Sequence, residues 1–359
     1  MKKLFFFVFA ILLIGVMAAA VFIILKNSKT IEFNSIGKKE SENSQNVFNP
    51  AALKWEKVNT KNIWSARDAH TVVVFQDKLW LFGGLEGGSG KNPVYEKLPH
   101  KSDIWVSGDG TYWQQITDKT KWGQRRSIGA VVFQDKIWLM GGWENKYGET
   151  KNDVWVSDNG KDWKIITGSA QWEPREGHSV AVFKDKIWVV GGVDFLKRKI
   201  YNDVWYSEDG KKWTEAIVNA PWSERYDHTL TVFQDKLWLI GGLNFGDDVK
   251  GDIWVSEDGI NWQKVSDNPP WLPRHGHGAL VFNDLIWLMG GWCEGKGGLN
   301  DSWYSKDGYV WEETENKAQW LGREDHTTVV FKDKILMMGG MADEGKTWSW
   351  QNDIWQSTF

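Results

Sequence analysis

Short apolar runs separated by polar turns make up most of this chain, and the first such unit begins at residue 71. Residues 71–75 (TVVVF) and 79–82 (LWLF) are apolar runs with only Gln-Asp-Lys between them. Runs of β-branched and aromatic residues joined by a short polar turn predict a β-hairpin. A third run containing Trp105 and a fourth beginning at Trp113 flank an Asp-Gly turn, which favours a second hairpin. No stretch beyond residue 54 has sustained helical periodicity, so the pattern predicts an all-β domain.

This four-strand unit occurs six times along the chain. With individual departures, each copy contains W-x-x-R-x-x-H, a hairpin that ends in Gly-Gly, an N-D-x-W segment and S-x-D-G-x-x-W. The first glycines of the pairs are Gly83, Gly141, Gly191, Gly241, Gly290 and Gly339. Their spacings of 58, 50, 50, 49 and 49 residues are typical of propellers, in which each repeat forms one blade. We therefore expect a six-bladed β-propeller with four strands per blade.

The two ends of the chain share the last of these repeats. The sixth copy stops at Phe359, soon after Trp355, and lacks its fourth strand. Residues 55–58 (WEKV) resemble residues 213–216 (WTEA), which form the fourth strand of an inner copy. The N-terminal strand is therefore expected to complete the last blade and close the ring, which removes exposed sheet edges. We assign the propeller to residues 54–359.

The repeat resembles the kelch repeat, whose signature is an R-x-x-H start, a hairpin ending in Gly-Gly and a later Trp. The resemblance covers residues 55–359 and recurs in register, although Ile128 replaces the motif histidine and Leu336 replaces the tryptophan of the second strand. It implies a kelch-type propeller similar to the central domain of galactose oxidase. It also implies that a binding scaffold is the most common role.

One histidine per repeat, outside the second, occupies the same motif position. These residues are His70, His178, His228, His277 and His326. A column with one histidine per blade is what blade-to-blade hydrogen bonds would produce, so we interpret it as structural and not as a metal site. The copper site of galactose oxidase needs a ligand set that this sequence does not offer. No metal and no cofactor are therefore expected.

The N-terminus predicts a membrane attachment. Residues 4–25 are 22 residues without a charge, and at about 1.5 Å per residue a helix of this length crosses a bilayer core of about 30 Å. We assign residues 1–25 to a signal anchor, with the propeller outside the cytoplasm. Residues 18–20 (AAA) offer a cleavage site, and cleavage there would give a secreted protein. Residues 26–53, rich in Asn, Ser, Lys and Glu, read as a flexible polar linker.

Charge and cysteine content exclude several classes of partner and site. The net charge is −4 and no basic run occurs, which argues against nucleic acid as a partner. The single cysteine, Cys293, cannot form an internal disulfide and excludes cysteine-cluster metal sites.

Arginine is rare and placed selectively. The chain has eight arginines against 35 lysines. Six of them, which we call the motif arginines, occupy one motif position: Arg67, Arg125, Arg175, Arg225, Arg274 and Arg323. Each could pair with a motif aspartate and lock adjacent blades, the aspartates being Asp103, Asp153, Asp203, Asp252, Asp301 and Asp353. Alternatively, some guanidinium groups are free for a carboxylate, phosphate or sulfate on a ligand.

Residues that break the repeat are the better candidates for function. Of 27 tryptophans, four lie outside the motif columns, between a Gly-Gly pair and the third strand: Trp143, Trp292, Trp348 and Trp350. An indole next to polar groups is a platform for stacking on a sugar or a peptide side chain. The position after each motif arginine also varies, as Asp68, Arg126, Glu176, Tyr226, His275 and Glu324. The expected ligand-binding set is thus the motif arginines together with Arg126, Tyr226, His275 and the four tryptophans.

Two functions fit these residues. The first is a membrane-tethered recognition module outside the cytoplasm that binds a glycan, an acidic small molecule or a protein partner on the arginine and tryptophan face. The alternative is an enzyme acting on a carbohydrate acid, similar to the exported kelch-type sialic acid mutarotases, in which a motif arginine holds the carboxylate and Glu176 or Glu324 moves protons. A purely structural envelope protein is a third reading. Because no catalytic constellation is legible in the sequence, we favour binding.

Overall fold

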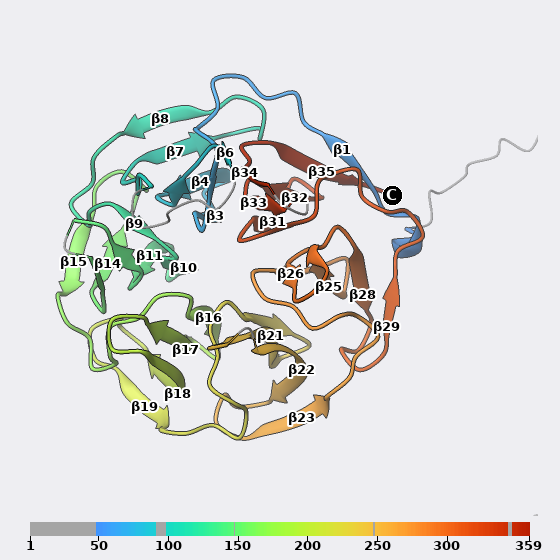
Figure 1. The fold of residues 1–359 in the computed structure, drawn as a ribbon. Helices are drawn as coiled ribbons and strands as arrows, with labels where there is room; N and C mark the ends of the chain where they lie inside the picture. The colour runs from blue at the N-terminus through green and yellow to red at the C-terminus, as the bar shows by residue number, and fades with distance from the viewer. Residues whose placement is uncertain (1–47, 91–97, 147, 247, 344–346) are drawn as a thin grey trace, which may run out of the picture. The chain divides into compact units, whose positions relative to one another are not determined.

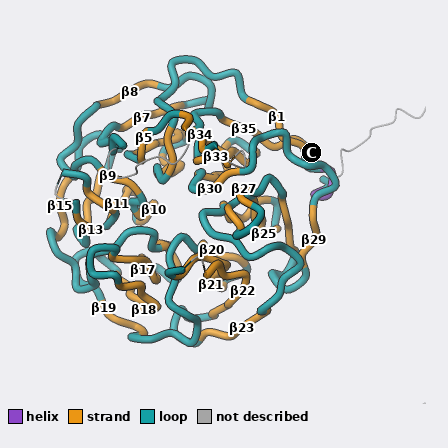
Figure 2. The backbone as a smooth tube through the Cα atoms, viewed as in Figure 1, coloured by secondary structure: helices purple, strands orange, loops and turns teal. Residues whose placement is uncertain are grey.

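The computed structural model describes residues 48–90, 98–146, 148–246, 248–343 and 347–359. The described residues are strands and loops apart from one 3₁₀ turn, η1 (Pro50–Ala52), as Figure 2 shows. The all-β prediction is therefore confirmed. Within this part of the chain no helix is long and apolar enough to cross a membrane. The expected signal anchor (residues 1–25) lies outside the described residues.

Seven four-stranded antiparallel sheets occur in the described residues, and six of them correspond to the six repeats. The first sheet has the order β3 (Thr71–Phe75), β4 (Lys78–Phe82), β7 (Ile104–Ser107), β8 (Gln114–Thr117). The second has the order β10 (Gly129–Phe133), β11 (Lys136–Met140), β14 (Val154–Ser157), β15 (Lys164–Thr167). The third has the order β16 (Ser179–Phe183), β17 (Lys186–Asp194), β18 (Lys199–Ser207), β19 (Thr214–Ile217).

The remaining three sheets repeat this order. The fourth consists of β20 (Thr229–Phe233), β21 (Lys236–Asn244), β22 (Asp248–Ser256) and β23 (Trp262–Ser266). The fifth consists of β24 (Gly278–Phe282), β25 (Leu285–Met289), β28 (Ser302–Ser305) and β29 (Trp311–Glu313). The sixth consists of β31 (Thr327–Phe331), β32 (Lys334–Met338), β35 (Ile354–Thr358) and β1 (Lys54–Lys57). The last of these sheets thus combines the two ends of the described chain.

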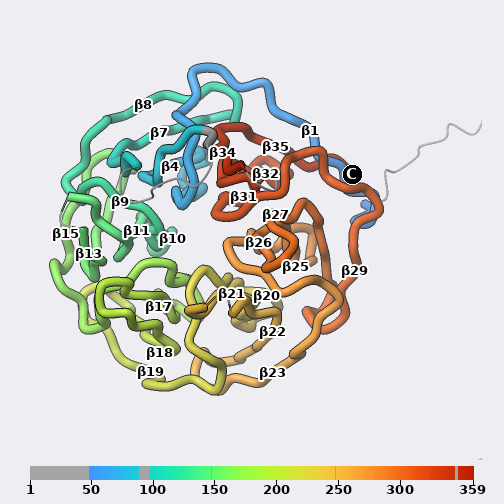
Figure 3. The backbone as a smooth tube through the Cα atoms, in the orientation of Figure 1, coloured from blue at the N-terminus to red at the C-terminus, as the bar shows by residue number. Residues whose placement is uncertain are grey.

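The sheets stand around a common axis, with the first strand of each nearest the axis (Figure 1). Each inner strand contacts the inner strands of its two neighbours, and β3 contacts β31. Figure 3 shows the trace passing from β1 around the axis to β35, which lies beside β1. In that pair Lys54 is opposite Thr358 and Lys57 is opposite Trp355, which is the pairing expected from the sequence.

The first hairpin of every repeat turns in the same way. Gln76 and Asp77, between β3 and β4, have φ of 49° and 54°, and the equivalent pairs in the other five repeats have φ between 48° and 59°. Two consecutive residues with positive φ match the right-handed twist of the flanking strands. The short polar turn that the sequence places here is therefore a tight hairpin.

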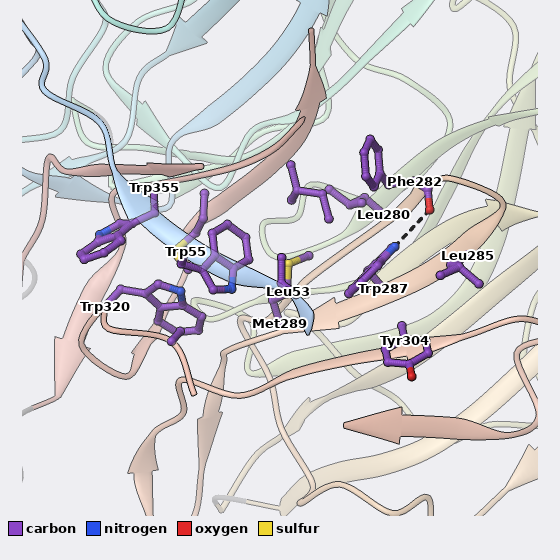
Figure 4. Packing of buried hydrophobic residues seen from close by; sticks show 13 residues of the cluster. Leu53, Trp55, Leu280, Phe282, Leu285, Trp287, Met289, Tyr304, Trp320 and Trp355 are labelled. Atoms are coloured by element: carbon purple, nitrogen blue, oxygen red, sulfur yellow. Dashed lines mark hydrogen bonds between the residues drawn. The ribbon is translucent and has the colours of Figure 1, made fainter. Parts of the chain in front are cut away.

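Tryptophans of the motif fill the space between neighbouring sheets. Figure 4 shows the cluster between the fifth and sixth sheets, where Trp287 donates its indole N–H to the carbonyl of Phe282 at 3.1 Å. Trp55 of β1 is 5% exposed, donates to Ser302 Oγ at 3.3 Å and packs edge-on against Trp320. The N-terminal strand is thus part of the core.

The compact unit starts earlier than the sequence suggested. It begins at Phe48, whereas the expected linker ran to residue 53. Leu53 is fully buried in the cluster of Figure 4, and Phe48 and Ala51 pack against it. Three apolar residues in a polar stretch were enough to anchor it. Residues 26–47 of the expected linker lie outside the described residues.

Candidate ligand-binding site

The motif arginines are buried and each binds a motif aspartate with two hydrogen bonds. In the third repeat, Arg175 Nη1 donates to Asp203 Oδ1 at 2.6 Å and Nη2 donates to Oδ2 at 2.8 Å. Nη1 also donates to the carbonyl of Gly191, the first glycine of the pair, at 2.8 Å. The same three bonds recur in the other repeats. Arg175 is 0% exposed, and no motif arginine exceeds 3%.

The backbone of each motif arginine is hydrogen-bonded to the preceding repeat. Arg175 N donates to Lys151 O at 3.1 Å, and its carbonyl accepts from Gly142 N at 2.9 Å. The guanidinium thus binds its own repeat while the backbone binds the preceding one. The residue joins two neighbouring repeats, in agreement with the interpretation that the motif arginines lock adjacent blades. Planar bidentate pairing explains why arginine and not lysine occupies the position.

The motif arginines are consequently not the ligand residues that the sequence analysis named. Their guanidinium groups already bind a carboxylate and a carbonyl, and they are shielded from solvent. This corrects the assignment for the whole set: Arg67, Arg125, Arg175, Arg225, Arg274 and Arg323.

The histidine column also joins neighbouring sheets, mostly through its backbone. His277 Nε2 lies 3.0 Å from Thr229 Oγ1 of the preceding repeat, as a blade-to-blade bond requires. Elsewhere the carbonyl at this position accepts the hydroxyl bond, as in Thr71 Oγ1 to Ile128 O at 2.6 Å. Every residue has a backbone carbonyl, so isoleucine can replace histidine in the second repeat without loss of this hydrogen bond. Burial lowers the pKa of His70 to about 3, so the ring is neutral.

The residue after each motif arginine pairs with the residue after Gly-Gly in the same repeat. These pairs are Asp68 with Leu85, Arg126 with Trp143, Glu176 with Val193, Tyr226 with Leu243, His275 with Trp292, and Glu324 with Met341. We call the surface formed by the first members of these pairs the axial mouth. Two of the four non-motif tryptophans are therefore held at it.

Aromatic rings stand beside the polar groups of the axial mouth. Arg126 Cζ lies 5.8 Å from the ring centre of Trp143, and the rings of His275 and Trp292 are 5.5 Å apart. Both indoles are half-buried. These four predicted ligand residues, together with Tyr226, are thus brought to one face by the fold.

The next position in each repeat forms a ring around the axis. Its residues are Ala69, Ser127, Gly177, Asp227, Gly276 and Asp325, all with φ between 46° and 60°. At every position except Gly177, the N–H group donates to the carbonyl of the equivalent residue one repeat earlier, as in Ser127 to Ala69 at 2.8 Å and Asp325 to Gly276 at 2.8 Å. The ring surrounds an axial cavity of about 170 Å³.

Asp227 and Asp325 are functional candidates that the sequence analysis missed. Both line the axial cavity, and each places Oδ1 over a glycine of the preceding repeat. A Cβ on Gly177 would lie 2.6 Å from Asp227 Oδ1, and a Cβ on Gly276 would lie 2.7 Å from Asp325 Oδ1. The signal was in the sequence, because this motif position has small residues in four repeats and aspartate in two.

The two carboxyls that line this cavity, Asp227 and Asp325, interact electrostatically with three more carboxyls nearby: Asp68, Glu176 and Glu324. Burial, reinforced by the neighbouring carboxyl of Asp325, raises the pKa of Asp68 and of Asp227. Burial also raises the pKa of Asp325 to about 6. These carboxyls therefore lose their protons at higher pH than isolated carboxyls do.

Two contacts organise the cluster. Arg126 Nε lies 2.9 Å from Glu176 Oε2, which keeps that carboxylate paired. His275 Nδ1 lies 3.4 Å from Glu324 Oε2, and both side chains are at most 10% exposed. Burial lowers the pKa of His275 to about 4 and, with the charge of Asp325, raises the pKa of Glu324. The pair thus combines a neutral imidazole with a carboxyl whose pKa is raised.

Comparison with known proteins agrees with the repeat pattern. The family profile of the KLHDC2/KLHL20/DRC7 Kelch-repeats domain matches residues 27–242, more than half of the chain. The chain belongs to the kelch-repeat family. Its fold is also similar to the solved "Structure of YjhT", at 16% identity and a TM-score of 0.65, over 82% of this kelch chain and 96% of the other. A search of curated proteins gave no match.

The last two predicted residues of this kelch protein do not behave alike. Both lie on β34 (Trp348–Trp350), which pairs with β33 (Met341–Asp343) and β6 (Ser89–Gly90). Trp350 is 6% exposed and its ring covers Gly87, where a Cβ would lie 2.1 Å from the indole. It therefore packs within the loops, whereas Trp348 is half-buried. Among the described residues, no group of three or more His, Cys, Asp or Glu is arranged to hold a metal ion.

Proposed function

We propose that this kelch protein is a recognition module that binds a glycan at the axial mouth. The observation that carries the proposal is the combination of two carboxyls that line the axial cavity with two half-buried indoles beside residues of the axial mouth. Sugar hydroxyls donate hydrogen bonds to carboxyl oxygens, and a sugar ring stacks on the face of an indole. Arg126 adds donors on the same surface.

The distribution of charge favours a glycan over the acidic ligand that the sequence also suggested. An anion would need free guanidinium groups, but the motif arginines are bound to their aspartates. Arg126, which does lie at the mouth, is paired with Glu176. An anionic ligand would also meet the carboxyls of Asp227 and Asp325 in the cavity.

We further infer that the six sheets act as one closed, six-bladed propeller tethered to a membrane. The pairing of β1 with β35 supports closure. The 22 uncharged residues at positions 4–25 support a tether, with the propeller outside the cytoplasm. Nucleic acid is not proposed as a partner, because the net charge is −4.

The test is direct binding to sugars. The full chain, purified in detergent, is screened on a glycan array, and the best ligand is titrated by calorimetry. Trp143→Ala and Trp292→Ala are expected to weaken binding at least about tenfold, since each removes a stacking contact worth on the order of 1 kcal/mol together with the apolar area that it buries. The unfolding midpoints of both variants should stay close to that of the wild type. Tyr112→Ala, at a 55% exposed aromatic outside the axial mouth, is the control and retains full affinity. Absence of any glycan ligand, or wild-type affinity in both tryptophan variants, contradicts the proposal.

Catalysis on the bound sugar is a second candidate, favoured by the contact between His275 and Glu324. A carboxyl with a raised pKa beside a neutral imidazole can exchange a proton with a bound sugar, as interconversion of sugar anomers requires. The carboxylate of a sugar acid would have to bind Arg126, because the motif arginines are occupied. NMR exchange rates with wild type and Glu324→Gln decide the matter, and equal rates exclude this role for Glu324.

A further inference from the structure

We propose that the glycan site extends from the axial mouth onto two neighbouring hairpin tips, so that the ligand is a linear chain of several sugars and not a single sugar. This inference rests on the proposed glycan function and specifies the class of glycan. Three features carry it: two hairpins that continue beyond the Gly-Gly pairs, exposed phenylalanines at their tips, and a tyrosine that joins these rings to the axial mouth.

The two long hairpins belong to the third and fourth repeats. β17 and β21 are nine residues long and run through Gly-Gly, whereas β4, β11, β25 and β32 are five residues long and end directly before it. Beyond Gly-Gly, Val193 pairs with Ile200 in the first long hairpin. In the second, Leu243 pairs with Val249. Because Leu243 also pairs with Tyr226, the second hairpin continues beside the axial mouth.

The tip of the first hairpin is held in one conformation by its own hydrogen bonds. Asp194 Oδ1 accepts the backbone N–H groups of Leu196 and Lys197 at 3.1 and 3.2 Å. The backbone N–H of Arg198 donates to the carbonyl of Phe195 at 3.2 Å. This turn presents Phe195 and Leu196 to solvent, with 39% and 64% of their surface exposed. A site on a fixed turn loses less conformational freedom when a ligand binds.

Three aromatic rings connect the tips to the axial mouth. The ring of Phe195 lies 5.5 Å from the ring of Tyr226 and 6.1 Å from the ring of Phe245, between centres. Phe245 is at the tip of the second hairpin and is 38% exposed. We call these three residues the aromatic strip. Since Tyr226 is part of the axial mouth, a sugar chain bound there can continue along the strip and contact apolar rings.

Hydrogen-bond donors lie beside the aromatic strip. Arg198 Cζ is 6.0 Å from the ring centre of Phe245, and Lys199 is exposed on the same hairpin. Within the described residues neither cation forms an ion pair, whereas the neighbouring Lys197 binds Glu173 at 2.8 Å. Guanidinium and ammonium groups donate hydrogen bonds, and sugar hydroxyls accept them. The strip therefore combines apolar rings with donors, as a sugar requires.

The exposed area is too small for a protein partner or a second copy of the chain. An aromatic side chain buries about 150–250 Å² when it is fully covered, so Phe195 and Phe245 together with Leu196 offer on the order of 300 Å². A stable protein interface covers roughly 800 Å² on each partner. A glycan already held at the mouth needs less area, because each further contact forms within a bound complex.

The experiment varies the length of the sugar chain. A glycan array carries linear oligomers of glucose, N-acetylglucosamine, mannose and galactose, each with two and with six sugars. The series that binds best is titrated into the full chain, in a detergent without a sugar headgroup. We expect the hexasaccharide to bind at least about tenfold more tightly than the disaccharide. The double variant Phe195→Ala/Phe245→Ala should reduce this gain to less than about threefold, without weakening binding of the disaccharide.

Two conservative double variants separate ring stacking from a loss of structure. Phe195→Tyr/Phe245→Tyr keeps the rings and should keep the full gain with length. Phe195→Leu/Phe245→Leu keeps apolar side chains but removes the rings, and it should lose the gain. The unfolding midpoints of all variants should stay close to that of the wild type, because both positions are exposed.

Two single variants locate the effect. Trp143→Ala acts at the axial mouth and should weaken binding of the disaccharide and the hexasaccharide by the same factor. Tyr309→Ala changes an aromatic residue that is 53% exposed and lies outside the aromatic strip, so it should leave both affinities unchanged.

The outcomes distinguish the extended site from the glycan function itself. Equal affinity for the two lengths, or an undiminished gain in the alanine variant, overturns the extension and leaves glycan recognition standing. Binding of single or branched sugars without any of the linear series has the same meaning. No glycan ligand at all removes both. A dimer seen by light scattering that the alanine variant abolishes would show that a second copy covers the tips, and it would also overturn the extension.

Discussion

Arg126 and Glu176 occupy the same motif position in successive repeats, and their side chains meet with Nε 2.9 Å from Oε2. A second bond joins Nη2 to Oε1 at 3.3 Å. The side chain of Glu176 is 4% exposed and that of Arg126 is 20% exposed. The second and third repeats are therefore joined by an ion pair at the variable motif position, so charges in one repeat of the axial mouth affect the next.

Breaking this pair should destabilise the fold moderately. Arg126→Leu leaves the Glu176 carboxylate without its partner in a buried position, and we expect a loss of about 2 kcal/mol, less than for a fully buried pair because Arg126 is partly exposed. The double variant Arg126→Leu/Glu176→Leu should recover most of this loss. Urea unfolding measures both, and equal stability of the single variant and the wild type would show that the pair contributes nothing.

A motif arginine should matter more. Arg175→Ala strands Asp203 and the carbonyl of Gly191, and we expect a loss of about 3 to 5 kcal/mol in unfolding free energy. Arg198→Ala is the control, because Arg198 is exposed and its substitution should change stability by less than about 0.5 kcal/mol. If the two variants unfold at the same denaturant concentration, the blade-locking role of Arg175 is refuted.

The N-terminal strand should be needed for stability. Trp55→Ala removes a buried indole of β1 and should cost about 3 to 5 kcal/mol. Glu56→Ala, at the exposed neighbouring position, is the matched control and should be close to neutral. A chain beginning at Thr60 lacks the whole strand and should melt many degrees below one beginning at Phe48. Coincident melting curves would mean that β1 does not support the sixth sheet.

Asp325 should make stability depend on pH. Its pKa is raised from 3.8 to about 6 by burial, with Glu176 adding to the rise and Arg126 opposing it. Well below the ordinary value of 3.8 the carboxyl is protonated in both the folded and the unfolded chain. As the pH rises from 3.8 to about 6, the unfolded chain ionises while the folded chain keeps its proton, so stability is lost over this range and the loss is complete above it.

Asp325→Asn removes this loss. We expect the variant to exceed the wild type at pH 8 by on the order of 1 kcal/mol, discounted because the side chain is partly exposed, and to match it at about pH 2. Asp325 also raises the pKa of Asp68, Asp227 and Glu324, so the substitution relieves them as well, and the difference between the two curves reports the coupled cluster. A difference that is independent of pH would contradict the raised pKa.

The protein should remain attached to membranes. Residues 4–25 carry no charge over 22 positions, and such a span is not extracted by alkaline carbonate. Fractionation of expressing cells, with sequencing of the mature N-terminus, tests this. A soluble product that begins near Val21 would show that the segment is a cleaved signal.

The sequence alone determined the repeat and the strand order within it. A period of about 50 residues, with Gly-Gly and tryptophan at fixed offsets, reflects local hairpins whose turns and apolar faces depend on neighbouring residues. The same regularity identified residues 55–58 as the strand missing from the last repeat, and β1 pairs with β35.

Only the tertiary structure decided the role of the charged residues that recur in every repeat. Arg175 lies 28 residues from Asp203, and nothing in that spacing says whether its guanidinium meets that carboxylate or a ligand. The sequence was compatible with both possibilities, and the structure shows that Arg175 is buried and paired with Asp203. Likewise, Asp227 and Asp325 are 98 positions apart in the chain and become neighbours in charge because the ring brings equivalent positions to one axis. Proximity across repeats is a property of the arrangement of the sheets around one axis, and it is this arrangement that brings Asp227 and Asp325 to the same cavity.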